Sequence, residues 1–175
     1  MILHPLRSLV RAGVSDICVV SSPEDLPSLI RLLGDGSEFD ADLTYRVQAE
    51  PKGVAQALSL TRDFVGANDL AVVLGDNVFD ADLAQYTKNF MGGAQCFLHE
   101  VSDPARYGVA ILDHDGRLVA IEEKPESPAS RLAVTGVYLY EQDVFRRTNV
   151  ESSARGEFEI TDVLRASLAQ GELLH

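Results

Sequence analysis

The chain has 175 residues, of which 46% are hydrophobic and 24% are charged. These values are typical of one soluble globular domain that buries roughly 70% of its unfolded surface. No apolar run approaches the ~20 residues that span a bilayer, and the N-terminus lacks the pattern of a signal peptide. We therefore expect a single domain over residues 1–175, cytoplasmic and without a membrane partner.

The formal net charge of −12 makes nucleic acid an unfavourable partner and also repels free nucleotides. If the chain binds phosphates, it must use a few well-placed cations, backbone N–H groups and a metal ion. Alternatively, the acidic composition only increases the solubility of the chain and has no role in binding. The only cysteines, Cys18 and Cys96, lie in apolar segments, which favours buried free thiols in a reducing compartment.

The first ninety residues alternate between short apolar runs and segments with helical periodicity. Gly13 and Gly34 end the first two helices, and the second begins at Ser22-Pro23-Glu24-Asp25. The predicted elements in chain order are helix 5–12, strand 17–20, helix 22–33, strand 43–47, helix 54–64, strand 70–74 and helix 82–90. This order favours a parallel sheet, with Leu70–Leu74 as a central strand covered on both faces.

Beyond Ala94 the predicted strands follow one another closely, and Asp115-Gly116 indicates a hairpin. The predicted elements are strands 96–101, 107–112, 118–122 and 133–140, then helices 143–147 and 160–169. The fold class expected from both halves is α/β: a Rossmann-like, mostly parallel sheet flanked by helices, with a partly antiparallel extension.

Polar residues follow several of these strands, at the edge where α/β sheets bind ligands. Asp76 comes directly after the most apolar strand, where a carboxylate can hold Mg²⁺ together with substrate phosphates. Gln48 ends another strand, and Gly53 opens the next helix, whose free N–H groups suit phosphate. For Asp76 a helix cap is an equal alternative, and for Gln48 and Gly53 an ordinary loop is the better one.

Further along, Glu123 and Lys124 follow a strand, where a carboxylate and a cation could bind a phosphorylated sugar together. Arg155, before the last helix, could form a planar fork to phosphate. Gly108 would let a ligand lie against the backbone. A surface ion pair, a solvated helix start and a plain turn are the respective alternatives, and all three are common.

The order of these segments is more specific than any one of them. Together they resemble the sugar-1-phosphate nucleotidyltransferase family, and within it most closely the glucose-1-phosphate thymidylyltransferases, over almost the whole chain. The segments that carry the resemblance are Leu33–Ser37, Val47-Gln48, Gly53–Ala57, Leu74–Asn77, Asp103-Pro104, Arg106–Val109, Glu122–Pro125, Val134–Gly136 and Arg155–Asp162.

The resemblance implies nucleotidyl transfer from a nucleoside triphosphate, with dTTP favoured, to a sugar 1-phosphate, with glucose 1-phosphate favoured. It implies Mg²⁺ as cofactor, with Asp76 as a ligand, and a base-binding role for Gln48 and Gly53. The sugar would be lined by Gly108, Glu123 and Val134. Lys124 and Arg155 would hold its phosphate as the catalytic cations.

The chain also departs from the family pattern, since it lacks the glycine-rich G-G-x-G-T-R-L loop and the W-x-D-T-G-T segment. We therefore expect a domain truncated at both ends. In the family a further strand lies between the strands expected at 17–20 and 70–74, so two apolar edges would be exposed here. Such edges favour self-association, and we expect a marginally stable chain or a homo-oligomer.

Three other interpretations stay open. The chain could be a nucleotide-sugar-binding subunit without turnover, or an inactive fragment of such an enzyme. An aspartate after a buried strand also suits a phosphate-accepting signalling domain, but the other acids and the lysine of that class have no counterpart in the order of motifs here.

Overall fold

The computed structural model describes residues 1–148, 153 and 156–175. Its first half contains the elements α1 (Leu3–Arg11), β1 (Asp16–Ser21), α2 (Leu26–Leu33), η1 (Ser37–Phe39), β2 (Asp42–Val47), α3 (Val54–Ser59), α4 (Arg62–Val65), β3 (Leu70–Val73) and α5 (Leu83–Asn89). Its second half contains β4 (Ala94–Glu100), η2 (Pro104–Arg106), β5 (Gly108–Leu112), β6 (Leu118–Glu123), β7 (Leu132–Tyr140), η3 (Gln142–Arg146), α6 (Ile160–Ala169) and β8 (Leu173–Leu174).

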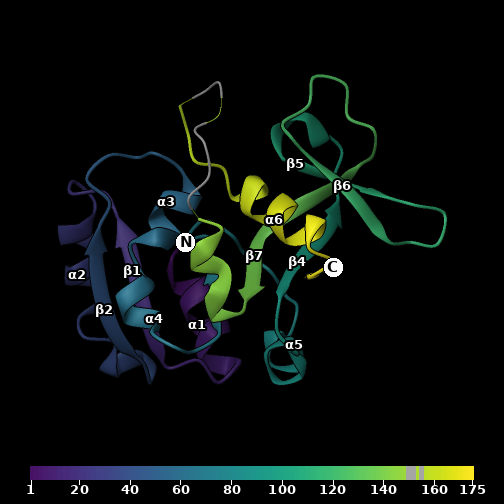
Figure 1. The fold of residues 1–175 in the computed structure, drawn as a ribbon. Coiled ribbons are helices and arrows are strands. Elements are labelled where there is room, and N and C mark those ends of the chain that lie inside the picture. The colour runs from purple at the N-terminus through teal and green to yellow at the C-terminus, as the bar shows by residue number, and fades with distance from the viewer. Residues whose placement is uncertain (149–152, 154–155) are drawn as a thin grey trace.

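The strands form two separate sheets, which Figure 1 shows side by side. The small sheet contains β1 and β2, which pair in parallel from Asp16 opposite Asp42 onward. The large sheet has the order β6-β5-β7-β4-β8, and β3 also pairs with β7. These pairings confirm the α/β class and the β5–β6 hairpin.

The pairing of β3 differs from the expected parallel arrangement. β3 lies antiparallel to β7, with Leu70 opposite Tyr140 and Val73 opposite Val137. Among the described strands, the parallel pairs are β1–β2 and β4–β8, so antiparallel pairing predominates in the large sheet. The reason is the partner strand. β7 is nine residues long and pairs with β3, β4 and β5. It follows β3 in the chain by about sixty residues, so a local βαβ order does not set the direction of β3.

β3 is also less covered than its apolar sequence predicts. All four of its residues are only half-buried, and its edge away from β7 pairs with no described strand. Among the strands that the structure describes, β1 likewise pairs with β2 alone. Two unpaired edges are therefore present, as the resemblance led us to expect.

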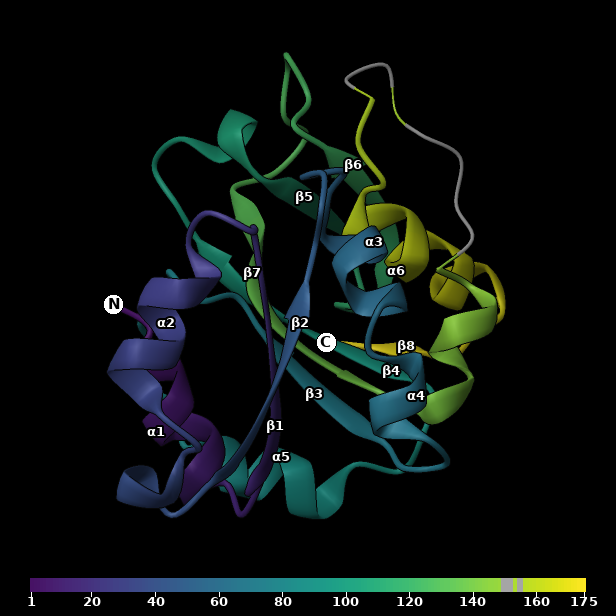
Figure 2. The ribbon, with the colours of Figure 1, turned by 90° about the vertical axis from the view of Figure 1, so that its left-hand side faces the viewer.

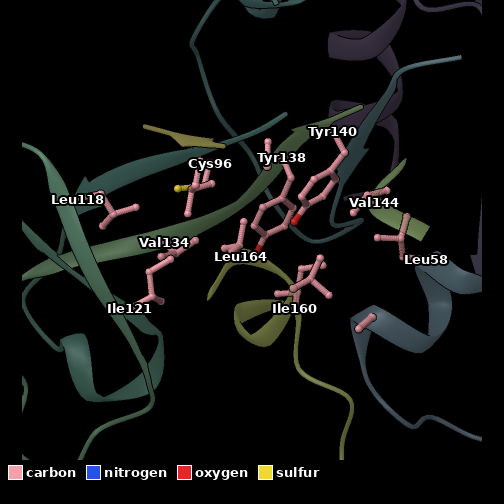
Figure 3. Packing of buried hydrophobic residues seen from close by; sticks show 14 of the residues in the cluster. Leu58, Cys96, Leu118, Ile121, Val134, Tyr138, Tyr140, Val144, Ile160 and Leu164 are labelled. Carbon is pink, nitrogen blue, oxygen red and sulfur yellow. The ribbon is translucent and has the colours of Figure 1, made fainter. Parts of the chain in front are cut away.

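Two hydrophobic cores support the two sheets. The larger core packs α6 and α3 against β4 to β8, and Figure 3 shows Tyr140 and Leu164 in it. Both side chains are fully buried, as is that of Val163. The smaller core joins α1 and α2 to β1 and β2 through Leu6, Leu33 and other aliphatic side chains. The large sheet therefore has the larger hydrophobic core.

The predicted helix 54–64 is interrupted at Leu60 and Thr61. The hydroxyl of Ser59 donates to the carbonyl of Gln56, and that of Thr61 donates to the carbonyl of Leu58. Such side-chain bonds to the backbone compete with the helical ladder, which accounts for the division into α3 and α4.

Candidate active site

A gap along one edge of β7 brings several predicted site residues together. On that edge β3 pairs with Val137 to Tyr140, and β5 pairs with Ala133. The carboxyl end of β3 and the amino end of β5 therefore meet beside residues 134–136 of β7. Strand ends leave backbone groups and short loops exposed, which makes this place suited to a ligand.

Asp76 lies at the β3 side of the gap and is exposed. The amide nitrogen of Asn77 donates to Asp76 Oδ1 over 2.8 Å, and Asn77 Oδ1 accepts from the backbone N–H of Gly136 over 3.1 Å. The N–H of Leu74 donates to the carbonyl of Gly136. The side chain of Asn77 thus attaches the loop that contains Asp76 to the middle of β7.

Gly108, Glu123 and Val134 converge on the β5 side of the gap. A Cβ atom on Gly108 would lie 2.7 Å from Thr161 Cγ2, 3.4 Å from Glu123 Oε2 and 3.7 Å from Val134 Cβ. Thr161 Oγ1 also donates to Glu123 Oε2 over 2.9 Å. The missing side chain of Gly108 therefore makes room for Thr161, which in turn orients the Glu123 carboxylate.

Lys124 follows Glu123 in an unusual backbone conformation. Its φ is +43°, in the left-handed region that non-glycine residues rarely adopt. Its N–H donates to the carbonyl of Tyr107, and its ammonium lies 3.9 Å from Glu123 Oε1. The side chain is 44% exposed, against 17% for Glu123. Strained conformations of this kind gather at functional sites, and this one presents a cation to solvent beside a fixed carboxylate.

Gln48 and Gly53 lie together at the carboxyl end of β2. Gln48 Nε2 donates to the carbonyl of Gly53 over 3.0 Å and to Gln56 Oε1 over 2.7 Å. Gly53 has a φ of +99°, and a Cβ there would lie 2.4 Å from the carbonyl oxygen of Phe158. Only glycine fits this position, because the 52–55 loop presses directly on the backbone before α6.

The start of α6 joins the two groups of residues. The N–H of Phe158 donates to the carbonyl of Lys52, and the carbonyl of Phe158 accepts from the N–H of Ala55. Three residues later, Thr161 contacts Glu123 and packs against Gly108. The segment 158–161 therefore connects the loop that carries Gly53 with Gly108 of β5 and Glu123 of β6.

Tyr138 adds a buried phenol on the same face of β7 as Val134 (Figure 3). Burial raises the pKa of Tyr138, and the negative charge of the Glu123 carboxylate adds to the shift. The phenol therefore stays protonated at neutral pH and remains a hydrogen-bond donor.

Among the predicted site residues, Arg155 lies outside the described part of the chain. The structure brings Gly108, Glu123, Lys124 and Val134 together. It places Asp76 after the carboxyl end of β3 and the Gln48–Gly53 pair after the carboxyl end of β2. Sequence reasoning gave no role to Asn77, Phe158, Thr161 or Tyr138, although Asn77, Phe158 and Thr161 belong to segments that carried the resemblance. A threonine in the first turn of a helix was the available signal for Thr161.

The surroundings of Asp76 suit a Mg²⁺ ion whose remaining coordination positions are filled by substrate phosphates. Mg²⁺ commonly takes one or two carboxylates and fills its other positions with phosphate oxygens and water. Asp76 supplies one exposed carboxylate, held by Asn77 at the strand end. Another acidic group, Asp113-His114-Asp115, lies in the β5–β6 turn, where Asp113 Oδ1 accepts from the N–H groups of Asp115 and Arg117 and so serves the turn itself.

No helix in the described residues is long and apolar enough to cross a membrane. The whole chain, residues 1–175, matches the nucleotidyl transferase family. It is 41% identical over 177 residues to a glucose-1-phosphate thymidylyltransferase of Mycolicibacterium smegmatis and 42% identical over 178 residues to that of Neisseria meningitidis. Each alignment covers 99% of this chain and 62% of the relative, so the chain spans less than two thirds of these relatives' length.

Solved structures give the same result. A Bacillus anthracis protein described as a glucose-1-phosphate thymidylyltransferase, crystallised with sucrose, superimposes with a TM-score of 0.92 at 41% identity, covering 99% of this chain and 72% of that one. A UDP-glucose pyrophosphorylase complexed with UDP-glucose superimposes with a TM-score of 0.79 at 22% identity, covering 95% and 74%, which reflects the shared fold. The chain therefore belongs to the nucleotidyl transferase family.

Proposed function

We propose that this chain forms part of an enzyme that transfers a deoxythymidylyl group from dTTP to glucose 1-phosphate. A phosphate oxygen of glucose 1-phosphate attacks the α-phosphorus of the triphosphate, and the bond from that phosphorus to the β-phosphate oxygen breaks. The products are dTDP-glucose and pyrophosphate. Both substrates are suggested by the relatives at about 40% identity.

The observation that carries the proposal is the arrangement around the start of α6. The segment 158–161 lies against Gly53 on one side and against Glu123 and Gly108 on the other. A base held near Gln48 and Gly53 and a sugar held near Glu123 and Val134 would then share one framework. Holding two reactants in a fixed relation supplies a large part of the rate enhancement in phosphoryl-type transfers.

The individual roles follow from chemistry. Glu123, oriented by Thr161, accepts hydrogen bonds from sugar hydroxyls, and Lys124 offers a cation to the sugar phosphate. Arg155 is proposed as a second phosphate-binding cation. Asp76 would hold Mg²⁺, which when bound neutralises phosphate charge in the transition state. Because the chain is strongly acidic, these few positive charges would supply most of the attraction for the substrates.

The test is Mg²⁺-dependent pyrophosphate release by the purified chain with dTTP and glucose 1-phosphate, together with calorimetric binding of dTDP-glucose. We expect Asp76→Asn to lower release by about 100-fold, as for the loss of one transition-state electrostatic contact, while Asp80→Asn leaves it unchanged. Lys124→Met should weaken dTDP-glucose binding by about tenfold or more, with Lys88→Met on α5 as its matched control.

Two results would decide between the alternatives. Binding of dTDP-glucose without pyrophosphate release would favour a binding subunit. Neither binding nor release would contradict the proposal for this chain.

A further inference from the structure

An irregular stretch of β7, residues 135–137, lies beside the candidate active site. β4 has one residue between Cys96 and Leu98, whereas the partners of these two residues on β7 are separated by three. Extra residues on one strand form a bulge, which redirects side chains and is common next to active sites. On its other edge β7 pairs with β5 and with β3, which lie beside its upper and lower parts in Figure 2, and the bulge borders the gap between them.

The bulge begins with a buried hydroxyl group that has no partner. Thr135 Oγ1 is shielded from solvent and makes no hydrogen bond within the part of the chain that the structure describes. An unpaired buried hydroxyl destabilises a protein, and a valine of the same shape would avoid that cost. The threonine at this position therefore indicates a hydrogen-bond partner that the present arrangement of the neighbouring loop does not supply.

The side chain of Asn77 lies directly against the bulge. Its Oδ1 accepts from the N–H of Gly136 over 3.1 Å, and its Nδ2 donates to Asp76 Oδ1 over 2.8 Å. A Cβ on Gly136 would lie 2.7 Å from Asn77 Nδ2 and 2.8 Å from both its Cγ and its Oδ1. Thr135 directly precedes Gly136, so its hydroxyl is only a few covalent bonds from the N–H that Asn77 already accepts.

The amide of Asn77 has a hydrogen to spare. Nδ2 carries two hydrogens, and Asp76 is its only acceptor among the described residues. The second hydrogen and the oxygen of Thr135 are thus a matching donor and acceptor near the same residue of β7. When Asp76 coordinates a cation, its oxygens become weaker acceptors, and Asn77 then gains by donating to Thr135.

We propose that Thr135 is a positioning residue of the candidate site. Its hydroxyl accepts from Asn77 Nδ2 when Asp76 coordinates a divalent cation, while the bond from the Gly136 N–H keeps the Asn77 amide against β7. The loop that contains Asp76 is then attached to the strand at two points, and such outer contacts of a ligand raise metal affinity. The role rests on the proposed function, in which Asp76 holds the Mg²⁺ ion.

The test separates the hydroxyl of Thr135 from its methyl group. Thr135→Val keeps the shape and removes the hydroxyl, and Thr135→Ser keeps the hydroxyl and removes the methyl. The full chain is titrated with Mn²⁺ in the presence of dTDP-glucose, and electron paramagnetic resonance measures the free ion. We expect Thr135→Val to weaken Mn²⁺ binding about fivefold, as for the loss of one neutral hydrogen bond, and Thr135→Ser to stay within about twofold of the unmodified chain.

Stability should change in the opposite direction. Without added metal, Thr135→Val should unfold at the same urea concentration as the unmodified chain or at a higher one, because it removes a buried hydroxyl that has no partner. Thr135→Ser should unfold at a lower concentration, because it leaves a small cavity. A purely structural residue would change stability and metal binding together. Thr44→Val, at a partly buried threonine of the small sheet, should leave Mn²⁺ binding unchanged.

The side-chain amide of Asn77 gives a direct readout of the new bond. In the ¹⁵N-labelled chain, Mg²⁺ added together with dTDP-glucose should slow the exchange of one Asn77 amide hydrogen with water. The same slowing is expected in Thr135→Ser and not in Thr135→Val. Asn77→Asp, which removes this signal, provides the assignment.

The possible failures are distinguishable. Equal Mn²⁺ affinity of Thr135→Val and the unmodified chain would overturn the inference and leave the proposed function standing. A loss of Mn²⁺ binding accompanied by a matching loss of stability would have the same meaning. Absence of any Mn²⁺ binding that Asp76→Asn removes would overturn both the inference and the cation site at Asp76, while binding of dTDP-glucose without metal tests the rest of the proposed function separately.

Discussion

The two sheets of this protein contain similar kinds of residues but differ in how completely they are assembled. In the large sheet, β7 pairs on both edges and α6 covers its face, so that Tyr140, Val163 and Leu164 are fully buried. In the small sheet, β1 has one paired edge, and its core side chains border an open cavity. Apolar side chains therefore stabilise a strand only where other strands and helices pack against it.

The largest expected effect is a difference between equivalent deletions in the two cores. Leu164→Ala, at a side chain that is 0% exposed, should lower the free energy of unfolding by about 3–5 kcal/mol. Leu43→Ala, on β2 and 8% exposed, should cost about 2–3 kcal/mol, because its surroundings can relax toward the nearby cavity. Urea unfolding of both variants measures the difference, and equal costs would contradict the contrast.

The second effect is a loss of stability at alkaline pH that originates in the large sheet. Burial raises the pKa of the Cys96 thiol from an ordinary 9.0 to about 12. The native thiol stays neutral while the unfolded thiol ionises, so its stabilising contribution is complete below pH 9 and is lost as the pH rises toward 12. The loss is about 1.4 kcal/mol per pH unit in that window.

Cys96→Ala removes this contribution, so its stability should fall less steeply above pH 9 than that of the unmodified chain. Buried Tyr138 and Tyr140, whose pKa values are also raised by desolvation, should leave a remaining slope above pH 10. Chemical unfolding at pH 8, 10 and 11 measures both slopes. Parallel curves for the two proteins would show that Cys96 is not protected as described.

A smaller effect concerns the connection between the two parts of the candidate site. Gly53→Ala should cost about 1–3 kcal/mol, because the new methyl group collides with the backbone of Phe158 in addition to the strain at positive φ. Gly116→Ala, also at positive φ but with open space around it, carries the strain alone. Only Gly53→Ala should also weaken dTDP-glucose binding, and equal behaviour of the two variants would argue against the connection.

The local features of this fold were predictable, and the long-range ones were not. Gly13 and Gly34 indicated helix ends, and Asp115-Gly116 indicated the hairpin, because these signals act within a few residues. The direction of β3 depends on β7, which lies far along the chain, and an apolar run of four residues carries no information about it.

The candidate site shows the same division. Glu123, Lys124 and Asp76 were selected because they follow strands, and the structure places them at strand ends. The contact of Gly53 with Phe158 and the bond from Thr161 to Glu123 join residues that are 105 and 38 positions apart in sequence. Only the packing of α6 brings them together.

The most direct test of the account is a titration of the isotopically labelled chain with dTDP-glucose, followed by NMR. The account predicts saturable shifts at Gly53 and Gln56 and at Gly108, Glu123 and Val134, with Phe158 and Thr161 shifting at the same ligand concentrations. The amides of the Asp113–Asp115 turn should not respond. Saturable shifts confined to one of the two groups, or no saturable shifts at all, would contradict a single site organised by the start of α6.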